Sequence, residues 1–148
     1  MNGTHATYIA VPWTSVYALP DSISTREGAA GLLQGLTALT FVTEAYKVKK
    51  GDSILIHTVA GGVGSLFAQL ARRVGATVIG TTSTFEKAKF AKENGVDHVI
   101  LYTQEDTVAR VLELTNGEGV DAIFDGVGKT TYVFLLLDLS DYQMSSCT

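Results

Sequence analysis

A glycine-rich turn, Ala60–Gly64, is the stretch of this chain most able to hold a charged ligand. It follows an apolar run, Ile54–Ile56, that is typical of a strand buried on both faces. After the turn, Leu66, Phe67 and Leu70 recur at helical spacing. Where a strand of a parallel sheet turns into a helix, the bare amides of the first helical turn face outward and the helix dipole favours an anion. The stretch therefore predicts a phosphate site, and the pyrophosphate of a dinucleotide is its natural ligand.

The glycine pattern is incomplete. The dinucleotide fingerprint G-x-G-x-x-G needs glycine at position 59, where this chain has Val59, so only Gly61 and Gly64 are in register. Taken alone, the turn is equally compatible with a purely structural connection. The segment Ala76–Gly80 reads as a second short strand, however, and it completes a strand–helix–strand unit of roughly 30 residues. This context favours dinucleotide binding.

The end of the second strand indicates which nicotinamide cofactor the chain prefers. A site selective for NAD usually places Asp or Glu about 20 residues after the glycine turn. This chain has hydroxyl side chains there, in Gly80–Thr84, followed by Lys87. A 2′-phosphate would be attracted by Ser83 and Lys87, through charge-assisted hydrogen bonds of roughly 1.5–3 kcal/mol each. We therefore predict NADPH rather than NADH; the alternative is that Lys87 is a solvated lysine on a basic helix surface with Lys89 and Lys92.

The chain before the glycine turn predicts short strands and helices. Residues 6–20 look like two short strands split by Pro12. Ser24 and Glu27 form a capping box that predicts a helix from near Thr25, in which Gly35 marks a break or close packing. A second helical segment, Thr37 to Tyr46, presents Leu39, Val42 and Tyr46 on one face, and Lys49 to Asp52 is a turn.

The alternation of helices and strands continues beyond the first unit. Residues 85–94 form a predicted helix closed by Gly95, residues 96–102 contain a strand, residues 105–115 form a helix, and residues 120–124 form a strand. Four strands alternating with three helices predict an α/β fold, a Rossmann-type doubly wound parallel sheet. Ligand binding is expected at its switch point, beside the first strand.

Composition excludes several classes of protein. The chain has 148 residues, 46% of them apolar, and a net charge of −4, which argues against disorder and against nucleic-acid partners. No apolar run approaches the ~20 residues that span a bilayer, and no secretory signal is apparent. The single cysteine, Cys147, fits a reducing compartment, and His5, His57 and His98 are not at metal-ligand spacing. We expect a cytoplasmic protein with no metal and no membrane partner.

Several motifs occur together and in order: LLQGLTALTFVTEAYKVKKGD, HTVAGGVG, TTSTFEKAKFAKENGVDHVI and TNGEGVDAIFDGVGK. With them, the chain from about Ala6 to Thr131 resembles the zinc-independent quinone oxidoreductases, the zeta-crystallin-like group of the medium-chain dehydrogenase/reductase superfamily. The resemblance implies NADPH-dependent reduction of quinones, often by one electron and without a metal.

The resemblance also implies a role for individual residues. Ser83, Lys87 and Tyr102 would surround the adenosine 2′-phosphate, although by sequence alone Tyr102 is an ordinary aromatic at a strand end. Thr37 would lie on the nicotinamide side, and the loop from Asp125 to Val127 would line the cofactor cleft. The residues implied to meet the pyrophosphate are Gly61, Gly62, Val63 and Gly64. No catalytic residue is identified: we expect His57 to pack at the end of its strand and Asp125 to organise its loop.

The two ends depart from the family pattern. Residues 1–22 match only the last strands of a barrel-like catalytic domain, residues 23–130 form the NADPH-binding domain, and residues 131–148 form a divergent tail. We therefore expect the Rossmann sheet to be incomplete at its C-terminal end. Gly126 stands where the family commonly has serine. The open sheet edge predicts a homo-oligomer or a marginally stable monomer, unless residues 132–137 cover it.

Two functions remain open on the sequence. The chain is either derived from an NADPH:quinone oxidoreductase, keeping cofactor binding with little or no turnover, or it is a non-enzymatic nucleotide-binding module that pairs with a full-length homologue. Quinone-dependent oxidation of NADPH distinguishes them.

Overall fold

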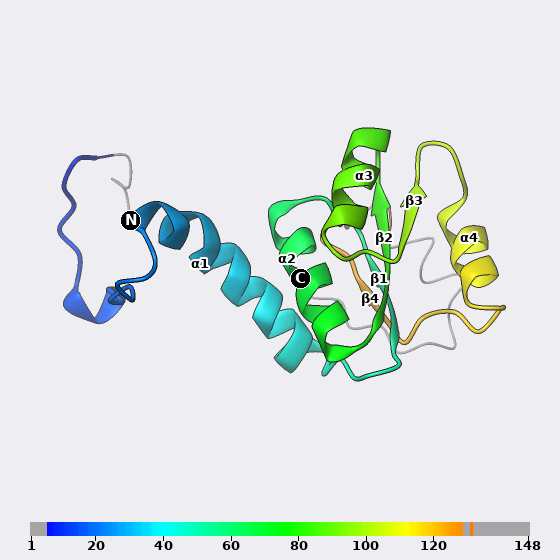
Figure 1. Cartoon of the computed structure of the whole chain (residues 1–148), viewed down its shortest axis with the longest axis horizontal. Helices are drawn as coiled ribbons and strands as arrows, with labels where there is room; N and C mark the ends of the chain where they lie inside the picture. Colours follow the sequence, from blue (N-terminus) through cyan, green and yellow to red (C-terminus); the bar gives the residue numbers. More distant parts are fainter. Residues whose placement is uncertain (1–5, 129–130, 132–148) are drawn as a thin grey trace. The chain divides into compact units, whose positions relative to one another are not determined.

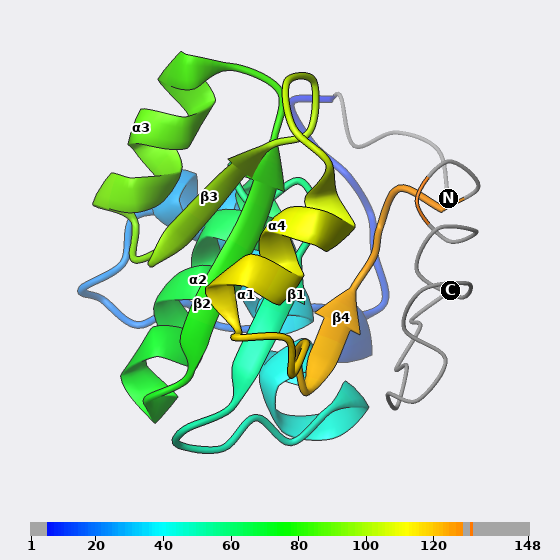
Figure 2. The same cartoon turned by 90° about the vertical axis from the view of Figure 1, so that its right-hand side faces the viewer.

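The computed structural model describes residues 6–128 and residue 131, and it divides between Leu32 and Leu33 into two units. Short apolar runs separated by helices place four parallel strands at the centre of the second unit: β1 (Ser53–Ile56), β2 (Thr77–Thr82), β3 (His98–Leu101) and β4 (Ala122–Phe124). Their order is β3-β2-β1-β4 (Figure 2). The chain therefore winds outward from β1 to β3 and then crosses back, so the switch point lies between β1 and β4. The predicted doubly wound parallel sheet is confirmed.

Three helices cover the two faces of this sheet. Helices α2 (Gly62–Val74) and α3 (Phe85–Glu93) pack on one face, and α4 (Thr107–Leu114) packs on the other (Figure 1). The side chains of the strands alternate between the two faces, as the pleat requires. On the α2 side, Ile54, Ile56 and Phe124 join Phe67 in one apolar cluster. On the α4 side, Leu55 and other strand residues join Val111 in a second cluster.

Local signals explain where the helices begin and end. Thr84 and Asp106 cap α3 and α4, because their side-chain oxygens accept hydrogen bonds from the N–H of Lys87 and Ala109. The predicted glycine after α3 is confirmed: Gly95 has a φ of +96°, a conformation that glycine adopts without strain.

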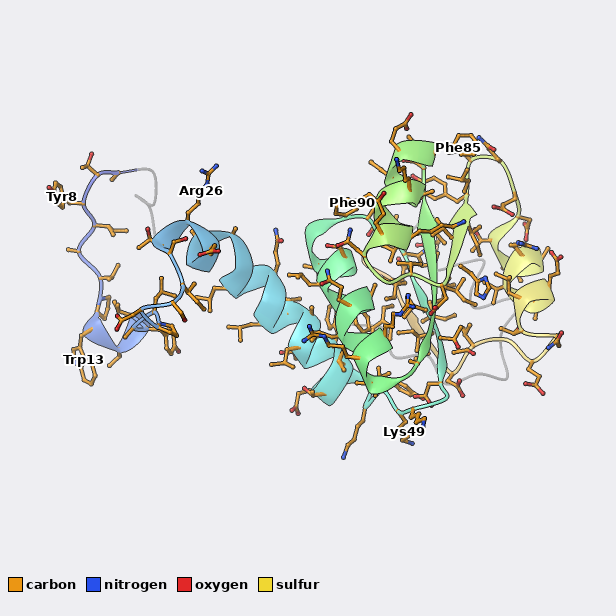
Figure 3. The ribbon with its side chains drawn as sticks, in the orientation of Figure 1. Tyr8, Trp13, Arg26, Lys49, Phe85 and Phe90 are labelled. Atoms are coloured by element: carbon orange, nitrogen blue, oxygen red, sulfur yellow. The ribbon has the colours of Figure 1, made fainter. Side chains whose placement is uncertain are left out.

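Residues 6–20 do not form the two strands that we predicted. Residues 6–20, all described, contain only a short 3₁₀ turn, η1 (Trp13–Ser15), and no strand. A strand needs a partner for its backbone groups, and the apolar pattern alone does not supply one. Tyr8 and Trp13 are 91% and 86% exposed (Figure 3). The prediction of two strands here is wrong.

Helix α1 (Thr25–Thr40) begins at the predicted capping box and runs through Gly35. The Ser24 N–H donates to Glu27 Oε2 at 2.9 Å, and the Glu27 N–H donates to Ser24 Oγ at 3.2 Å. Apart from its chain neighbours and the backbone of its own helix, no atom of the described residues lies within 4 Å of the place that a Cβ on Gly35 would take, so this glycine marks neither a break nor close packing. A single glycine costs a helix only about 1 kcal/mol, which the rest of α1 tolerates.

A π-helical turn, η2 (Phe41–Ala45), follows α1 where we predicted continued α-helix. The wider turn shifts which residues face the sheet. Val42 is buried and Tyr46 is half-buried, as predicted, but Leu39 is 46% exposed and Ala38 is buried in its place. The predicted cover of the sheet edge by residues 132–137 lies outside the described residues. No helix in the described part of the chain is long and apolar enough to cross a membrane.

Candidate functional site

A cavity of about 250 Å³ opens at the switch point between β1 and β4. Its walls come from the ends of these two strands and from the helical segments beside them. The β1 end contributes Ile56, His57 and Thr58, and the β4 end contributes Phe124, Asp125 and Gly126. The remaining lining residues are Thr37, Phe41, Val63, Gly64 and Phe67. This is the position at which open α/β sheets bind their ligands.

Three phenylalanines give this cavity, which we call the larger cavity, an apolar wall. The ring of Phe67 meets that of Phe124 edge-on, with the centroids 4.3 Å apart. Phe41 lies 5.9 Å from Phe67 and 6.0 Å from Phe124, also between centroids. Such edge-on and tilted packing holds the rings in place. The wall is suited to a flat, largely apolar ring.

A smaller cavity of about 140 Å³ lies on the β2 side of β1. It is lined by Thr58, Ala60, Gly61, Thr82, Ser83, Lys87 and Tyr102. Among the described residues that line it, Lys87 is the only charged one, and four others carry hydroxyl groups. An ammonium group and several hydroxyls, with no carboxylate in the lining, favour an anion such as a phosphate.

The glycine turn lies at the N-terminus of α2. Gly61 precedes the helix and has no side chain with which to cap it, so the first amides of α2 remain available. A Cβ on Gly64 would lie 2.7 Å from the carbonyl oxygen of Thr58 and 2.8 Å from Val59 Cα. The side chain of Gln34 occupies the place that a Cβ on Gly62 would take. The turn therefore needs glycine at position 64, where the obstacle is backbone, whereas at position 62 the flexible end of the Gln34 side chain could move aside.

Thr58 begins this turn in an unusual backbone conformation. Its φ is +54°, in the left-handed region, which costs a residue other than glycine roughly 1–2 kcal/mol. The chain is held on both sides: the His57 N–H donates to the Phe124 carbonyl at 3.0 Å, and the Val59 N–H donates to the Thr81 carbonyl at 3.1 Å. These bonds to strands on either side of β1 maintain the strain.

His57 is buried beside Thr81, as expected for packing at the end of its strand, and it also lines the larger cavity. Its Nδ1 lies 3.0 Å from Thr81 Oγ1, while Nε2 is buried with no hydrogen-bond partner in the described part of the chain. Burial lowers the pKa of His57, and the nearby Asp125 carboxylate partly opposes that shift. The neutral imidazole is therefore favoured in the folded protein.

Asp125 organises the loop after β4, as predicted. Its carboxylate accepts hydrogen bonds from the Val127 N–H at 2.8 Å, the Gly128 N–H at 3.2 Å and the Thr131 hydroxyl at 2.5 Å. Burial alone would raise the pKa of Asp125, but these hydrogen bonds outweigh it and lower the pKa below its usual value. The carboxylate is therefore ionised at neutral pH.

The lowered pKa of His57 predicts that acid destabilises the fold. Between the ordinary value of 6.5 and the lower folded pKa, the unfolded chain binds a proton that the folded chain does not, so the free energy of unfolding falls as the pH decreases below 6.5. One such group contributes a slope of at most about 1.4 kcal/mol per pH unit. Urea unfolding across this range is expected to show a shallower slope for His57→Phe. His98→Gln, at an exposed position on β3, is the control; equal slopes in wild type and His57→Phe would contradict the prediction.

The structure brings most of the predicted site residues to one edge of the sheet. Thr37, Val63 and Gly64 line the larger cavity, and Gly61, Ser83, Lys87 and Tyr102 line the smaller one. Gly62 starts α2 and lines neither cavity. Val127 also lines neither; it is 46% exposed, and its neighbour Gly126 takes the place on the cavity wall.

Sequence reasoning missed the phenylalanine wall, Thr58 and Thr82. The strand register contains a usable signal, since Ile56 pairs with Phe124 and so places the following residues, His57 and Asp125, side by side. Within residues 6–128 and 131, no group of three or more His, Cys, Asp or Glu side chains is placed to hold a metal ion.

Comparisons with known proteins show which family this chain resembles. The family described as zinc-binding dehydrogenase matches residues 62–140. A probable quinone oxidoreductase of Schizosaccharomyces pombe is 44% identical over 129 residues, which are 87% of this chain and 39% of the relative. A quinone oxidoreductase of Pseudomonas aeruginosa is 41% identical over 77% of this chain and 35% of its own length.

Solved structures of quinone oxidoreductases are also similar to this chain. The quinone oxidoreductase of Pseudomonas syringae pathovar tomato has a TM-score of 0.83 and 44% identity, over 86% of this chain and 39% of that one. The Escherichia coli quinone oxidoreductase complexed with NADPH has a TM-score of 0.80 and 37% identity, over 86% of this chain and 40% of that one. This chain thus spans about two fifths of the length of these relatives. It belongs to the zinc-binding dehydrogenase family of the medium-chain type, and quinone oxidoreductases are among the members it resembles.

Proposed function

We propose that this chain carries the NADPH-binding part of a quinone oxidoreductase. The observation that supports it most is the pair of cavities on either side of the glycine turn, one walled by aromatic rings and one lined by hydroxyls and Lys87. A dinucleotide has this same division, because a phosphorylated adenosine and a nicotinamide nucleoside are joined by a pyrophosphate. The E. coli relative is a quinone oxidoreductase complexed with NADPH.

The described residues fit such a cofactor. The uncapped amides at the start of α2 would hold the pyrophosphate, and Ser83, Lys87 and Tyr102 would hold the 2′-phosphate. The aromatic wall and Thr37 would take the nicotinamide half. NADPH would supply the reducing equivalents, and the protein would orient it and exclude water from one face of its ring.

Replacing Lys87 tests the assignment of the smaller cavity. Lys87→Ala is expected to raise the Kd for NADPH about tenfold, because one charge-assisted hydrogen bond to the 2′-phosphate is lost at an exposed position. The Kd for NADH, which lacks this phosphate, is expected to change less than about twofold. Calorimetric titration of both cofactors measures the two values.

Lys92→Ala is the matched control, since Lys92 lies in the last turn of the same helix, α3, and does not line the smaller cavity. It is expected to bind NADPH like the wild type. Equal affinities for NADPH and NADH in the wild type and in Lys87→Ala would sink the proposal of a 2′-phosphate site.

A second function is a nucleotide-binding module without turnover. It is suggested by the described residues themselves, which line two cavities of the cofactor type while none of them is identified as catalytic. Oxidation of NADPH followed at 340 nm, with and without a simple quinone, separates the two functions. Quinone-dependent oxidation supports the oxidoreductase, whereas binding of NADPH without such oxidation supports the module.

A further inference from the structure

Thr58 lies where the two cavities meet. It is the residue that their linings share. A dinucleotide with one nucleoside in each cavity must carry its pyrophosphate past this residue, because the pyrophosphate is the link between the two halves. The Gly61 N–H donates to the Thr58 carbonyl at 2.9 Å, so Thr58 also closes the turn that leads into the free amides of α2.

The backbone of Thr58 suits another residue type better than threonine. A β-branched residue at a φ of +54° is an outlier, and glycine or asparagine adopts this conformation far more readily. The side chain is exposed, and no hydrogen bond joins its hydroxyl to another residue in the described part of the chain. Threonine therefore neither eases the turn nor binds within the fold, which leaves its hydroxyl available to a ligand.

We propose that the Thr58 hydroxyl donates a hydrogen bond to the pyrophosphate of the bound dinucleotide, an inference that rests on the proposed NADPH site. It is the one side-chain donor in a turn whose other available donors, from Gly62 to Gly64 in the described chain, are backbone amides. Hydrogen bonds to charged acceptors are stronger than those between neutral groups, so this contact adds selectivity for a dinucleotide over either nucleoside alone.

Three variants of the whole chain test this inference by NADPH titration. Thr58→Val keeps the branched shape and loses the hydroxyl, and it is expected to raise the Kd about tenfold. Thr58→Ser keeps the hydroxyl, and its Kd is expected to stay within about threefold of the wild type. Wild-type affinity in Thr58→Val overturns the inference and leaves the NADPH proposal intact.

Thr58→Gly separates the backbone from the side chain. It is expected to weaken NADPH as Thr58→Val does, while its unfolding midpoint stays equal to that of the wild type or rises, because the strain at φ +54° is relieved. A lower unfolding midpoint in Thr58→Gly than in the wild type overturns the argument that threonine is strained at this φ.

Inorganic pyrophosphate is the second probe, followed by the amide chemical shifts of Gly61 to Gly64. Wild type is expected to saturate at lower pyrophosphate concentration than Thr58→Val. If pyrophosphate binds in this way and NADPH does not, the proposed function fails, and Thr58 contacts a pyrophosphate group that is not part of this dinucleotide. If wild type binds neither probe, both fail.

Discussion

Replacing Gly64 with alanine is expected to cost about 2–3 kcal/mol of folding free energy and to abolish measurable NADPH binding. The added Cβ would lie 2.7 Å from the Thr58 carbonyl oxygen and 2.8 Å from Val59 Cα. Both are backbone atoms. Val59 is fully buried and its N–H is hydrogen-bonded to Thr81 of β2, so the backbone of the turn cannot shift away from the added Cβ. Relief requires moving the start of α2, which displaces the amides proposed to hold the pyrophosphate. Urea unfolding and NADPH calorimetry measure the two effects.

Gly35→Ala is the matched control for this substitution. Gly35 lies inside α1, and beyond the backbone of its own helix no atom of the described residues lies within 4 Å of its ideal Cβ. Alanine there is expected to raise stability by about 0.5–1 kcal/mol, since it removes the entropic cost of a helical glycine. The same chemical change is thus predicted to act in opposite directions at the two positions. A stable Gly64→Ala that still binds NADPH would refute the steric argument.

The parts of the fold that the sequence predicted well are those specified by local chemistry. Ser24 and Glu27 specify the start of α1, and Gly95 specifies the end of α3, because each satisfies backbone groups within a few residues. The prediction of two strands in residues 6–20 was wrong because a strand depends on a partner strand that can be distant in sequence. The π turn at Phe41–Ala45 was not predicted for a related reason: Phe41 packs against Phe67 and Phe124, which are distant in sequence.

The candidate site divides in the same way. Ser83 and Lys87 were identifiable because the carboxyl ends of parallel strands meet at one edge, so residues just after each strand gather there. The aromatic wall was not identifiable, because Phe41, Phe67 and Phe124 come from segments far apart in the chain and meet only in the folded core. The left-handed φ of Thr58 was also not predictable, because threonine rarely adopts this conformation and so does not indicate it in a sequence.

The aromatic wall carries the largest expected effect on stability. Phe67→Ala is expected to cost about 3–5 kcal/mol, the range for deleting a buried ring from a packed core. Phe67 is 1% exposed and stands edge-on to Phe124, with centroids 4.3 Å apart, so its loss leaves a void between α2 and the sheet. Since a domain of this size is stable by only about 5–15 kcal/mol, the variant is expected to unfold at much lower urea.

Phe85→Ala provides the control, because Phe85 is 66% exposed at the start of α3 (Figure 3). Losing this ring is expected to change stability by less than about 0.5 kcal/mol, as at most exposed positions. Phe67→Leu fills most of the void and is expected to fall between the two. The two alanine variants differ in the burial of the ring that is removed, and the two Phe67 variants differ in the volume left empty. A Phe67→Ala protein as stable as Phe85→Ala would show that the wall is not part of a tightly packed core, and the larger cavity would then lack the rigid face that a nicotinamide ring requires.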